Sequence, residues 1–309
     1  MRYGVIGVGG VGGFYGGMLA NGGKAVVFIG KPHHVEVFKD KGLTVESFKH
    51  GTFTVRESGR VVFSDSLDTL KDVDVVLLCV KSYDTEEIAR KLSEIDGKFA
   101  VVSVQNGIEN EEILAKYLGS DRVIGATAFI GAYVKEPGVI VHKAAGLLEV
   151  GEIITTTVTD RIRRIAEDMA ETGIEVRISR NINYTLWKKL MWNVAFNPYS
   201  VVTRATVGEM LEHPEAFKVL KHLMEECMEV AKAWGVELKK ETMEKYLKSS
   251  PDLMNYKTSM LLDFERGKPL EIEGITGALV RKAEKKGIYV PYNHCIYATV
   301  LLLDEKREK

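Results

Sequence analysis

The sequence has little of several features that would place it in a specialised class of protein. Its 3 cysteines, Cys79, Cys227 and Cys295, are odd in number and far apart, so they predict neither a disulfide framework nor a zinc site. We expect each to be a small core hydrophobe, and no metal site. No apolar run approaches the roughly 18 residues needed to span a bilayer. With no room for a signal peptide before the first glycine motif, a cytoplasmic protein is expected.

An excess of charge of either sign is also missing. Lys plus Arg number 42 against 43 Asp plus Glu, for a formal net charge of -1. Because no run of basic residues provides the electrostatic footprint of a nucleic-acid binder, we expect no nucleic-acid partner. The chain has 309 residues, of which 45% are apolar and 28% charged. These values are typical of a soluble globular protein with room for two domains.

A glycine motif near the N-terminus predicts a dinucleotide site. Residues 2–6 (RYGVI) have the pattern of a buried strand, and residues 14–21 have helical spacing. The motif between them therefore lies in the strand–turn–helix context that G-x-G-x-x-G requires. We expect its backbone to approach a pyrophosphate at the N-terminus of the helix. The motif consists of Gly7, Val8, Gly9, Gly10, Val11 and Gly12.

The end of the second predicted strand, residues 25–29, bears on the choice of cofactor. An NAD-preferring protein usually carries Asp or Glu here, about 20 residues after the glycine loop, to bind the ribose 2′-hydroxyl. This chain has Gly30 and Lys31 instead. The missing carboxylate and the added cation favour a 2′-phosphate, and hence NADP. A solvated surface lysine is the alternative interpretation, and NAD stays open as a cofactor.

Two further strands end in polar residues of binding type. Residues 73–80 and 99–104 are nearly continuous apolar runs, a pattern typical of parallel strands covered on both faces. The first run ends at Lys81 and the second at Gln105-Asn106-Gly107. Ligands of open parallel sheets bind beyond the carboxyl ends of the strands. We therefore expect the glycine loop, Lys31, Lys81 and Asn106 to share one edge of the sheet.

The remaining patterns predict an α/β domain followed by a helical one. Residues 43–63 alternate in polarity, Thr159 is placed to cap a helix, and His142 is expected to be structural. From Arg180 onward the periodicity is helical, with helices over residues 214–234, 252–265 and 273–286. We predict a doubly wound domain over residues 1–179 and an all-α domain over 180–309. Further strands are expected at residues 123–129, 139–142, 147–150 and 175–178.

The first helix of the second domain carries a polar stripe. In residues 184–198 (YTLWKKLMWNVAFNP), Lys189, Asn193 and Asn197 are four apart and share one face, while apolar residues cover most of the rest. Burying these three polar groups costs several kcal/mol unless they are paired. One interpretation is a core network with a carboxylate and backbone groups. The other is a polar small molecule that pairs with the stripe and receives a proton from Lys189.

Six motifs together resemble the ketopantoate reductase (2-dehydropantoate 2-reductase) family. They occur in the family's order, from Gly7 to about Asn293: GVGGVG at 7–12, CVKSYDT around Lys81, QNG at 105–107, LWKKLMWNVAFNP at 186–198, TSM at 258–260 and LEIEGITG at 270–277. The resemblance implies a Rossmann domain joined to a helical domain of the 6-phosphogluconate dehydrogenase type. It implies NADPH and a 2-oxoacid substrate bound between them, for pantothenate and coenzyme A biosynthesis. The apolar helical domain favours a homodimer.

The resemblance also implies roles for residues of the second domain. Lys189 would donate the proton while hydride passes from NADPH to the ketone carbon. Glu271, the second predicted catalytic residue, would lie beside Lys189 and the cofactor. Asn193 and Asn197 would contact the substrate, and Ser259 would contact its carboxylate.

The remaining implied contacts and two departures concern cofactor and substrate. Asn106 would touch both nicotinamide and substrate, Lys81 would lie where the two meet, and Ala132 would approach the cofactor. Val207 and Tyr256 occupy positions where the family commonly has Asn, which weakens the case for ketopantoate itself. A reductase of another branched or aromatic 2-oxoacid is therefore one alternative. A non-catalytic NADP sensor is another alternative, but the presence of Lys189 favours an enzyme.

Overall fold

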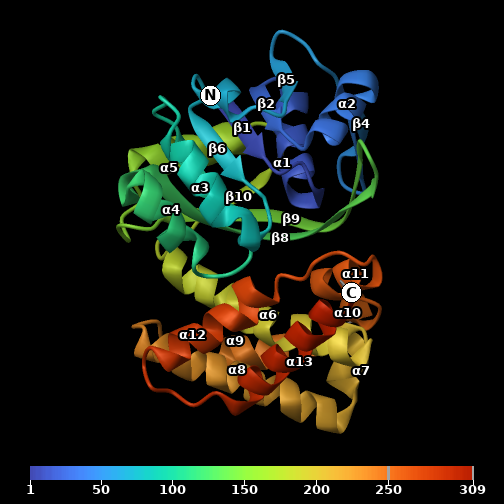
Figure 1. Cartoon of the computed structure of the whole chain (residues 1–309), viewed down its shortest axis with the longest axis vertical. Coiled ribbons are helices and arrows are strands. Elements are labelled where there is room, and N and C mark those ends of the chain that lie inside the picture. Colours follow the sequence, from blue (N-terminus) through green and yellow to red (C-terminus); the bar gives the residue numbers. More distant parts are fainter. Residues whose placement is uncertain (249–250, 308–309) are drawn as a thin grey trace. The chain divides into compact units, whose positions relative to one another are not determined.

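The computed structural model describes residues 1–248 and 251–307, and the chain divides into two units (Figure 1). The first unit comprises Met1–Gln105 and Asn110–Ile182. The second comprises Asn106–Glu109 and Asn183–Lys309. A four-residue segment that follows strand β7 thus groups with the helical part of the chain.

The first unit alternates strands with helices. Its strands are β1 (Arg2–Ile6), β2 (Ala25–Ile29), β3 (Leu43–Ser47), β4 (Gly51–Val55), β5 (Val61–Ser64), β6 (Val75–Leu78), β7 (Ala100–Ser103), β8 (Val123–Glu136), β9 (Val139–Glu152) and β10 (Glu175–Ile178). Its helices are α1 (Gly10–Asn21), α2 (Pro32–Lys41), α3 (Thr85–Ser93), α4 (Asn110–Leu118) and α5 (Asp160–Ala170), with short 3-10 turns η1 (Leu67–Leu70), η2 (Ser82–Asp84) and η3 (Ser120–Arg122).

Six parallel strands form the centre of the sheet, in the order β5-β2-β1-β6-β7-β8. The chain starts at β1, moves outward through β2 to β5, and then returns to the other side of β1. This is the order of a doubly wound dinucleotide-binding fold, whose topological switch lies between β1 and β6. The carboxyl ends of β1, β2, β6 and β7 are therefore neighbours, as the sequence predicts.

A long antiparallel hairpin extends the sheet. Strands β8 and β9 have 14 residues each and are joined through Pro137-Gly138, where Gly138 has φ +87°. Strand β9 also pairs with β3 and β10, and β3 pairs with β4. The sequence predicts three shorter strands here because the pairing register shifts at Phe129/Ile130 and Gly131/Ala132. Such irregularities interrupt the alternating pattern without ending the strands.

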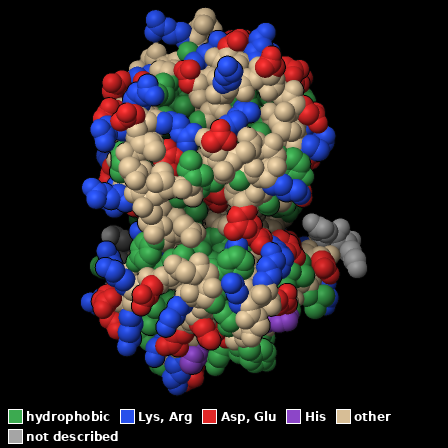
Figure 2. Space-filling model, turned by 90° about the vertical axis from the view of Figure 1, so that its left-hand side faces the viewer, with side chains coloured by type: hydrophobic (Ala, Val, Ile, Leu, Met, Phe, Trp, Pro, Cys, Tyr) green, Lys and Arg blue, Asp and Glu red, His purple; other side chains and the backbone are tan. Residues whose placement is uncertain are grey.

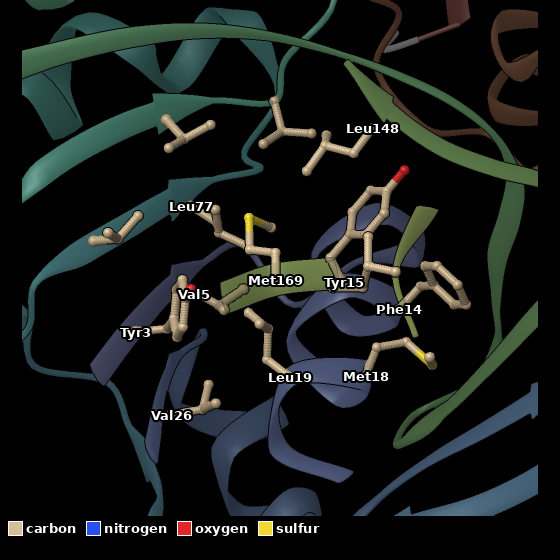
Figure 3. Close-up of a cluster of buried hydrophobic side chains, with 14 of the residues drawn as sticks. Tyr3, Val5, Phe14, Tyr15, Met18, Leu19, Val26, Leu77, Leu148 and Met169 are labelled. Carbon is tan, nitrogen blue, oxygen red and sulfur yellow. The ribbon is translucent and has the colours of Figure 1, made fainter. Parts of the chain in front are cut away.

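Alternate residues of the central strands face two separate cores. In β1, Tyr3 and Val5 pack with α1 and α5, whereas Ile6 packs with residues of α3 and α4 on the opposite face. Figure 3 shows the first of these cores, in which Tyr15 and Leu19 of α1 lie among side chains from the strands. Helices on both faces explain why the central strands read as continuous apolar runs.

The second unit is all-helical. It contains α6 (Ile182–Thr203, which begins at the last residue of the first unit), α7 (Val207–Glu212), α8 (Pro214–Ala233), α9 (Lys240–Tyr246), α10 (Pro251–Met254), α11 (Ser259–Glu265), a π-helical turn η4 (Glu273–Gly277), α12 (Ala278–Glu284) and α13 (Pro291–Arg307). The predicted fold class, a Rossmann-type sheet followed by an all-α part, is confirmed.

Two sequence-based expectations are wrong. The single helix predicted over residues 252–265 is two helices, because Thr258 adopts extended backbone and its hydroxyl accepts a hydrogen bond from Leu261 N, which starts α11 anew. The three cysteines are free, but only Cys227 is fully buried: Cys79 is half-buried and Cys295 is exposed on α13. Spacing on α13 does not reveal this, since that helix has no strongly apolar face.

Candidate functional site

Gly7 and Gly12 of the glycine loop in the first unit lie where a side chain would meet neighbouring backbone. Gly7 has φ +92°, and a Cβ there would lie 2.8 Å from Val80 N. A Cβ on Gly12 would lie 2.2 Å from the carbonyl oxygen of Gly7. The first of these glycines therefore makes the tight turn after β1, and the last lets α1 pack closely against that turn.

The position between them is open. Gly9 is the N-cap of α1, with φ -86° and ψ -161°, and no side chain caps the helix. A Cβ on Gly9 would have nothing among the described residues within 4 Å. The first N–H groups of a helix have no partner within the helix, and the positive end of its dipole favours an anion. The loop therefore fits a dinucleotide pyrophosphate, which it would bind through backbone N–H groups.

The other motif residues surround this open position. A Cβ on Gly10 would lie 2.4 Å from the carbonyl oxygen of Ala132 in β8, so the structure brings these two predicted cofactor residues together. Val8 and Val11 are partly buried and pack their side chains against the core. The two valines can thus offer a ligand little beyond their backbone.

The two predicted lysines follow neighbouring strands. Lys31 comes two residues after β2, is exposed, and is the N-cap of α2 without a side-chain cap bond. Lys81 follows β6, is half-buried, and starts η2. Both strands flank β1, so both lysines lie at the edge that carries the glycine loop. Binding of a ribose 2′-substituent by Lys31 stays a prediction.

Gln105 at the end of β7 was not singled out by the sequence. It is buried, and its Nε2 donates to Val80 O at 3.1 Å and to Thr85 Oγ1 at 2.7 Å. Thr85 in turn donates to Asn110 Oδ1 at 2.9 Å. This network fixes the ends of β6 and β7. The glutamine of the QNG motif is therefore structural.

The titratable groups beside the glycine loop are kept neutral. Burial raises the pKa of the Cys79 thiol to about 12, and Cys79 Cβ lies 2.9 Å from the position that a Cβ on Gly12 would take. Burial likewise raises the pKa of Tyr15. His142 is buried, with Ser47 Oγ 2.9 Å from its Nδ1 and Ala145 O 3.2 Å from its Nε2, and burial lowers its pKa. The Cys79 thiol and the Tyr15 hydroxyl therefore add no negative charge that would oppose an anionic ligand.

The polar stripe of α6 is buried in the second unit. Asn193 is 6% exposed and Asn197 is 3% exposed, while Lys189 is half-buried. The apolar residues around the stripe include Leu190 and Phe196, both essentially inaccessible. The predicted burial of the two amides is confirmed.

One amide of the stripe lacks a partner. Asn193 Nδ2 is inaccessible to solvent and forms no hydrogen bond with any described residue. A buried unpaired donor costs about 1–3 kcal/mol, so native proteins seldom retain one without a reason. A pure core network leaves this donor unexplained. A bound polar ligand would supply the acceptor.

A second polar pair lies in the same unit. Asn106 Nδ2 is 3.5 Å from Glu271 Oε2, and the Glu271 side chain is buried. Glu271 lies two residues before the π-helical turn η4, and its carbonyl accepts from Ile275 N at 3.1 Å. Single π turns occur often at functional sites, where they re-aim nearby side chains. The structure thus joins two residues 165 positions apart, both predicted to be in the site.

Ser259 is exposed at the first position of α11. The preceding Thr258 is buried, and its Oγ1 lies 2.7 Å from Ser200 Oγ, which donates to Asn197 O at 2.8 Å. These bonds attach the start of α11 to the C-terminal end of the polar stripe. Sequence reasoning missed Ser200 and Thr258, although the Thr258 cap had a recognisable signature.

The two departures from the family pattern meet in space. Val207 is fully buried, and its N–H donates to Tyr256 O at 2.9 Å. Tyr256 is 36% exposed. A Cβ on Gly208 would lie 2.4 Å from Met254 Cα, so the two backbone segments are in close contact. Both changes therefore affect one small region of the second unit.

Other binding chemistries find no support among the residues of ranges 1–248 and 251–307. No helix there is long and apolar enough to cross a membrane. In the same ranges, no group of three or more His, Cys, Asp or Glu side chains is arranged to hold a metal. On the face that Figure 2 displays, basic and acidic side chains are interspersed.

The fold and these residues define a class, namely proteins with an N-terminal dinucleotide-type sheet and a helical unit that carries a buried polar stripe. Two family models match the chain: ketopantoate reductase PanE/ApbA over residues 3–154, and ketopantoate reductase PanE/ApbA C terminal over residues 181–304. The chain belongs to the ketopantoate reductase PanE/ApbA family, and thus to the oxidoreductases.

Individual relatives agree with this assignment. The chain is 32% identical over 295 residues to a 2-dehydropantoate 2-reductase of Archaeoglobus fulgidus, covering 96% of this chain and 95% of that protein. A PanE/ApbA family ketopantoate reductase from Ralstonia eutropha superposes with a TM-score of 0.91 at 31% identity, over 100% of both chains. A D-mandelate dehydrogenase solved with NADH has a TM-score of 0.89 at 23% identity, covering 100% of this chain and 99% of that one, and shares the fold alone.

Proposed function

We propose that this protein reduces 2-dehydropantoate (ketopantoate) to pantoate with NADPH, as a step in pantothenate and coenzyme A biosynthesis. Family membership over both units and relatives named 2-dehydropantoate 2-reductase support the reaction. The observation that carries the proposal is the stripe of half-buried Lys189 and buried Asn193 and Asn197, in which the inaccessible Asn193 Nδ2 has no partner among the described residues. Such a stripe is suited to the oxygens of a small 2-oxoacid.

Each residue of the proposed site has its own role in the reaction. When bound, NADPH supplies the hydride that adds to the ketone carbon. Lys189 donates a proton to the ketone oxygen as negative charge develops there, which yields the 2-hydroxyacid. Asn193 and Asn197 orient the substrate, and Ser259 binds its carboxylate. Glu271 and Asn106 hold the reacting groups in register, with Asn106 Nδ2 already 3.5 Å from the Glu271 carboxylate.

Cofactor binding is assigned to the first unit. The backbone of Gly7, Val8, Gly9, Gly10, Val11 and Gly12 would bind the pyrophosphate, and Ala132 would border it. Lys31 would pair with the 2′-phosphate, which distinguishes NADPH from NADH, and Lys81 would lie near the nicotinamide end. We propose residues 1–179 as the NADP-binding domain. Residues 180–309 would form the substrate and dimerisation domain of a homodimer, which light scattering of the purified protein would test.

The test of the mechanism is Lys189→Ala with Lys188→Ala as its matched control. A positioned general acid contributes about 10²- to 10⁴-fold, so we expect kcat with ketopantoate to fall by that factor while the Kd for NADPH changes less than about twofold. Lys188 is also half-buried and lies about 100° away around the helix, so its variant should keep normal turnover. Near-normal turnover of Lys189→Ala would remove Lys189 from the mechanism.

A second candidate substrate is another branched or aromatic 2-oxoacid. The observation that favours it is that Val207 and Tyr256, which lack side-chain amides, lie in one region, where Val207 N donates to Tyr256 O at 2.9 Å. NADPH oxidation should be followed with a panel of 2-oxoacids that includes ketopantoate and phenylpyruvate. If kcat/KM is at least tenfold higher for a substrate other than ketopantoate, the second candidate replaces the first.

A further inference from the structure

An arginine outside the proposed reacting groups is held rigidly by the π-helical turn η4. Arg281 of α12 donates from Nη1 to Glu273 Oε2 at 2.7 Å and from Nη2 to Glu273 O at 2.8 Å. Tyr297 donates to the other carboxylate oxygen of Glu273 at 2.6 Å. Burial and the bond to Glu273 raise the pKa of Tyr297 to about 12, so the tyrosine stays a donor. The bonds to Glu273 alone therefore hold the Arg281 guanidinium in one orientation.

The same guanidinium binds the Asn106–Glu109 segment. Arg281 Nη2 also donates to Glu109 Oε2 at 2.7 Å, a short charge-assisted bond. At the other end of the segment, Asn106 Nδ2 lies 3.5 Å from Glu271 Oε2, near the outer limit of a hydrogen bond. Between them Gly107 has φ +107°. Three residues span at most about 11 Å, so fixing Glu109 restricts where Asn106 can lie.

We propose that Arg281 is a positioning residue for the reaction: by binding Glu109 it holds the Asn106–Glu109 segment so that the Asn106 amide faces Glu271 and the 2-oxoacid. This inference rests on the proposed function for the role of Asn106. Arg281 is not among the residues to which the proposed function gives a contact with substrate or cofactor. The ion pair is only half-exposed, at 40% for the Arg281 side chain and 21% for Glu109. Its effect should therefore be moderate but measurable.

The experiment combines Arg281→Met, Glu109→Gln, the double variant and Arg281→Lys. Each of the first two should lower kcat/KM for the 2-oxoacid by about three- to tenfold, as expected for a half-exposed ion pair of good geometry. The double variant should lose no more than either single variant, because both remove one contact. Arg281→Lys, which keeps a cation, should recover part of the loss. The pH profile of kcat and the Kd for NADPH should not change.

Hydrogen–deuterium exchange provides a readout that needs no activity. The peptide containing residues 106–109 should exchange faster in Arg281→Met and Glu109→Gln than in the wild type, while peptides of β1 and α1 stay the same. Tyr297→Phe is the control, since it removes one bond to Glu273 but leaves both Arg281–Glu273 bonds and the Arg281–Glu109 bond in place, and it should keep kcat/KM within twofold.

Three results would overturn the proposal: unchanged kcat/KM in Arg281→Met, losses that multiply in the double variant, or unchanged exchange of the 106–109 peptide. A wild-type protein that oxidises no NADPH with any 2-oxoacid would instead refute the proposed function. In that case the exchange experiment alone still decides whether Arg281 holds the segment.

Discussion

Two alanine substitutions in the N-terminal glycine loop, at open Gly9 and at packed Gly12, distinguish effects on cofactor affinity from effects on folding stability. At Gly9 the added methyl group would have no heavy atom of the described residues within 4 Å, and φ -86° with ψ -161° is accessible to alanine. The substitution therefore does not strain the folded protein without cofactor, and it lowers the backbone entropy of the unfolded chain. We expect the apparent stability of Gly9→Ala to be unchanged or raised by up to about 1 kcal/mol.

At Gly12 the opposite holds. The methyl group would lie 2.2 Å from Gly7 O, whereas ordinary contact begins at 3.4 Å, so backbone must move by the difference of about 1.2 Å. Overpacking costs about 1–3 kcal/mol or more. Alanine regains about 1 kcal/mol of helix propensity. Because the obstructing atom is backbone, we expect Gly12→Ala to lose about 2 kcal/mol net.

The assay is thermal unfolding of both variants together with NADPH titration by calorimetry. In Gly9→Ala the methyl group occupies the space through which a pyrophosphate would approach, so the Kd should rise at least about tenfold, or 1.4 kcal/mol. Wild-type NADPH affinity in Gly9→Ala would refute the assignment of the pyrophosphate to this loop. Wild-type stability of Gly12→Ala would refute the packing argument.

Three further predictions concern single side chains. Lys31→Asp should shift cofactor preference from NADPH toward NADH, measured as the ratio of the two kcat/KM values; an unchanged ratio would leave Lys31 a surface residue. Burial opposes ionisation of Asp168, but hydrogen bonds from Tyr3, Lys24 and the N-terminus lower its pKa below the ordinary value of 3.8. The stability that Asp168 contributes is therefore present above pH 3.8 and is lost as the pH falls through the lowered pKa. Asp168→Asn should therefore flatten the acid limb of a pH–stability curve, and an unchanged limb would contradict this. Buried Glu226 accepts from Tyr292 N and Asn293 N at 2.9 Å, at the N-terminus of α13, so Glu226→Ala should cost about 2–3 kcal/mol in denaturant unfolding. A loss below about 0.5 kcal/mol would show that water replaces the carboxylate.

Which 2-oxoacid the protein reduces can be decided by direct assay. Relatives at about 30% identity that are named 2-dehydropantoate 2-reductase match this chain over both units. Buried Val207 and exposed Tyr256, joined by a backbone hydrogen bond, are the two positions at which the sequence resemblance leads us to expect Asn. Restoring one amide with Tyr256→Asn, and comparing the 2-oxoacid panel before and after, would show whether that region selects the substrate.

The sequence by itself determined the features that depend on local order. The glycine loop directly after β1, the continuous apolar strands and the spacing of Lys189, Asn193 and Asn197 are encoded in periods of two and about 3.6 residues, which a linear pattern reveals. The parallel order of the sheet followed because consecutive strands with helical connections have few allowed topologies. Even the burial of the stripe could be predicted, since its neighbours on the helix are apolar.

Only the tertiary structure decided which distant residues meet. Nothing in the sequence indicates that Asn106–Glu109 groups with the helical unit, that Asn106 faces Glu271, or that Arg281 binds Glu109. Such contacts depend on how helices pack, and packing is set by the summed shape of many side chains rather than by any local period. The unpartnered amide of Asn193 is also a tertiary fact, because a hydrogen bond is absent only once every neighbour is known.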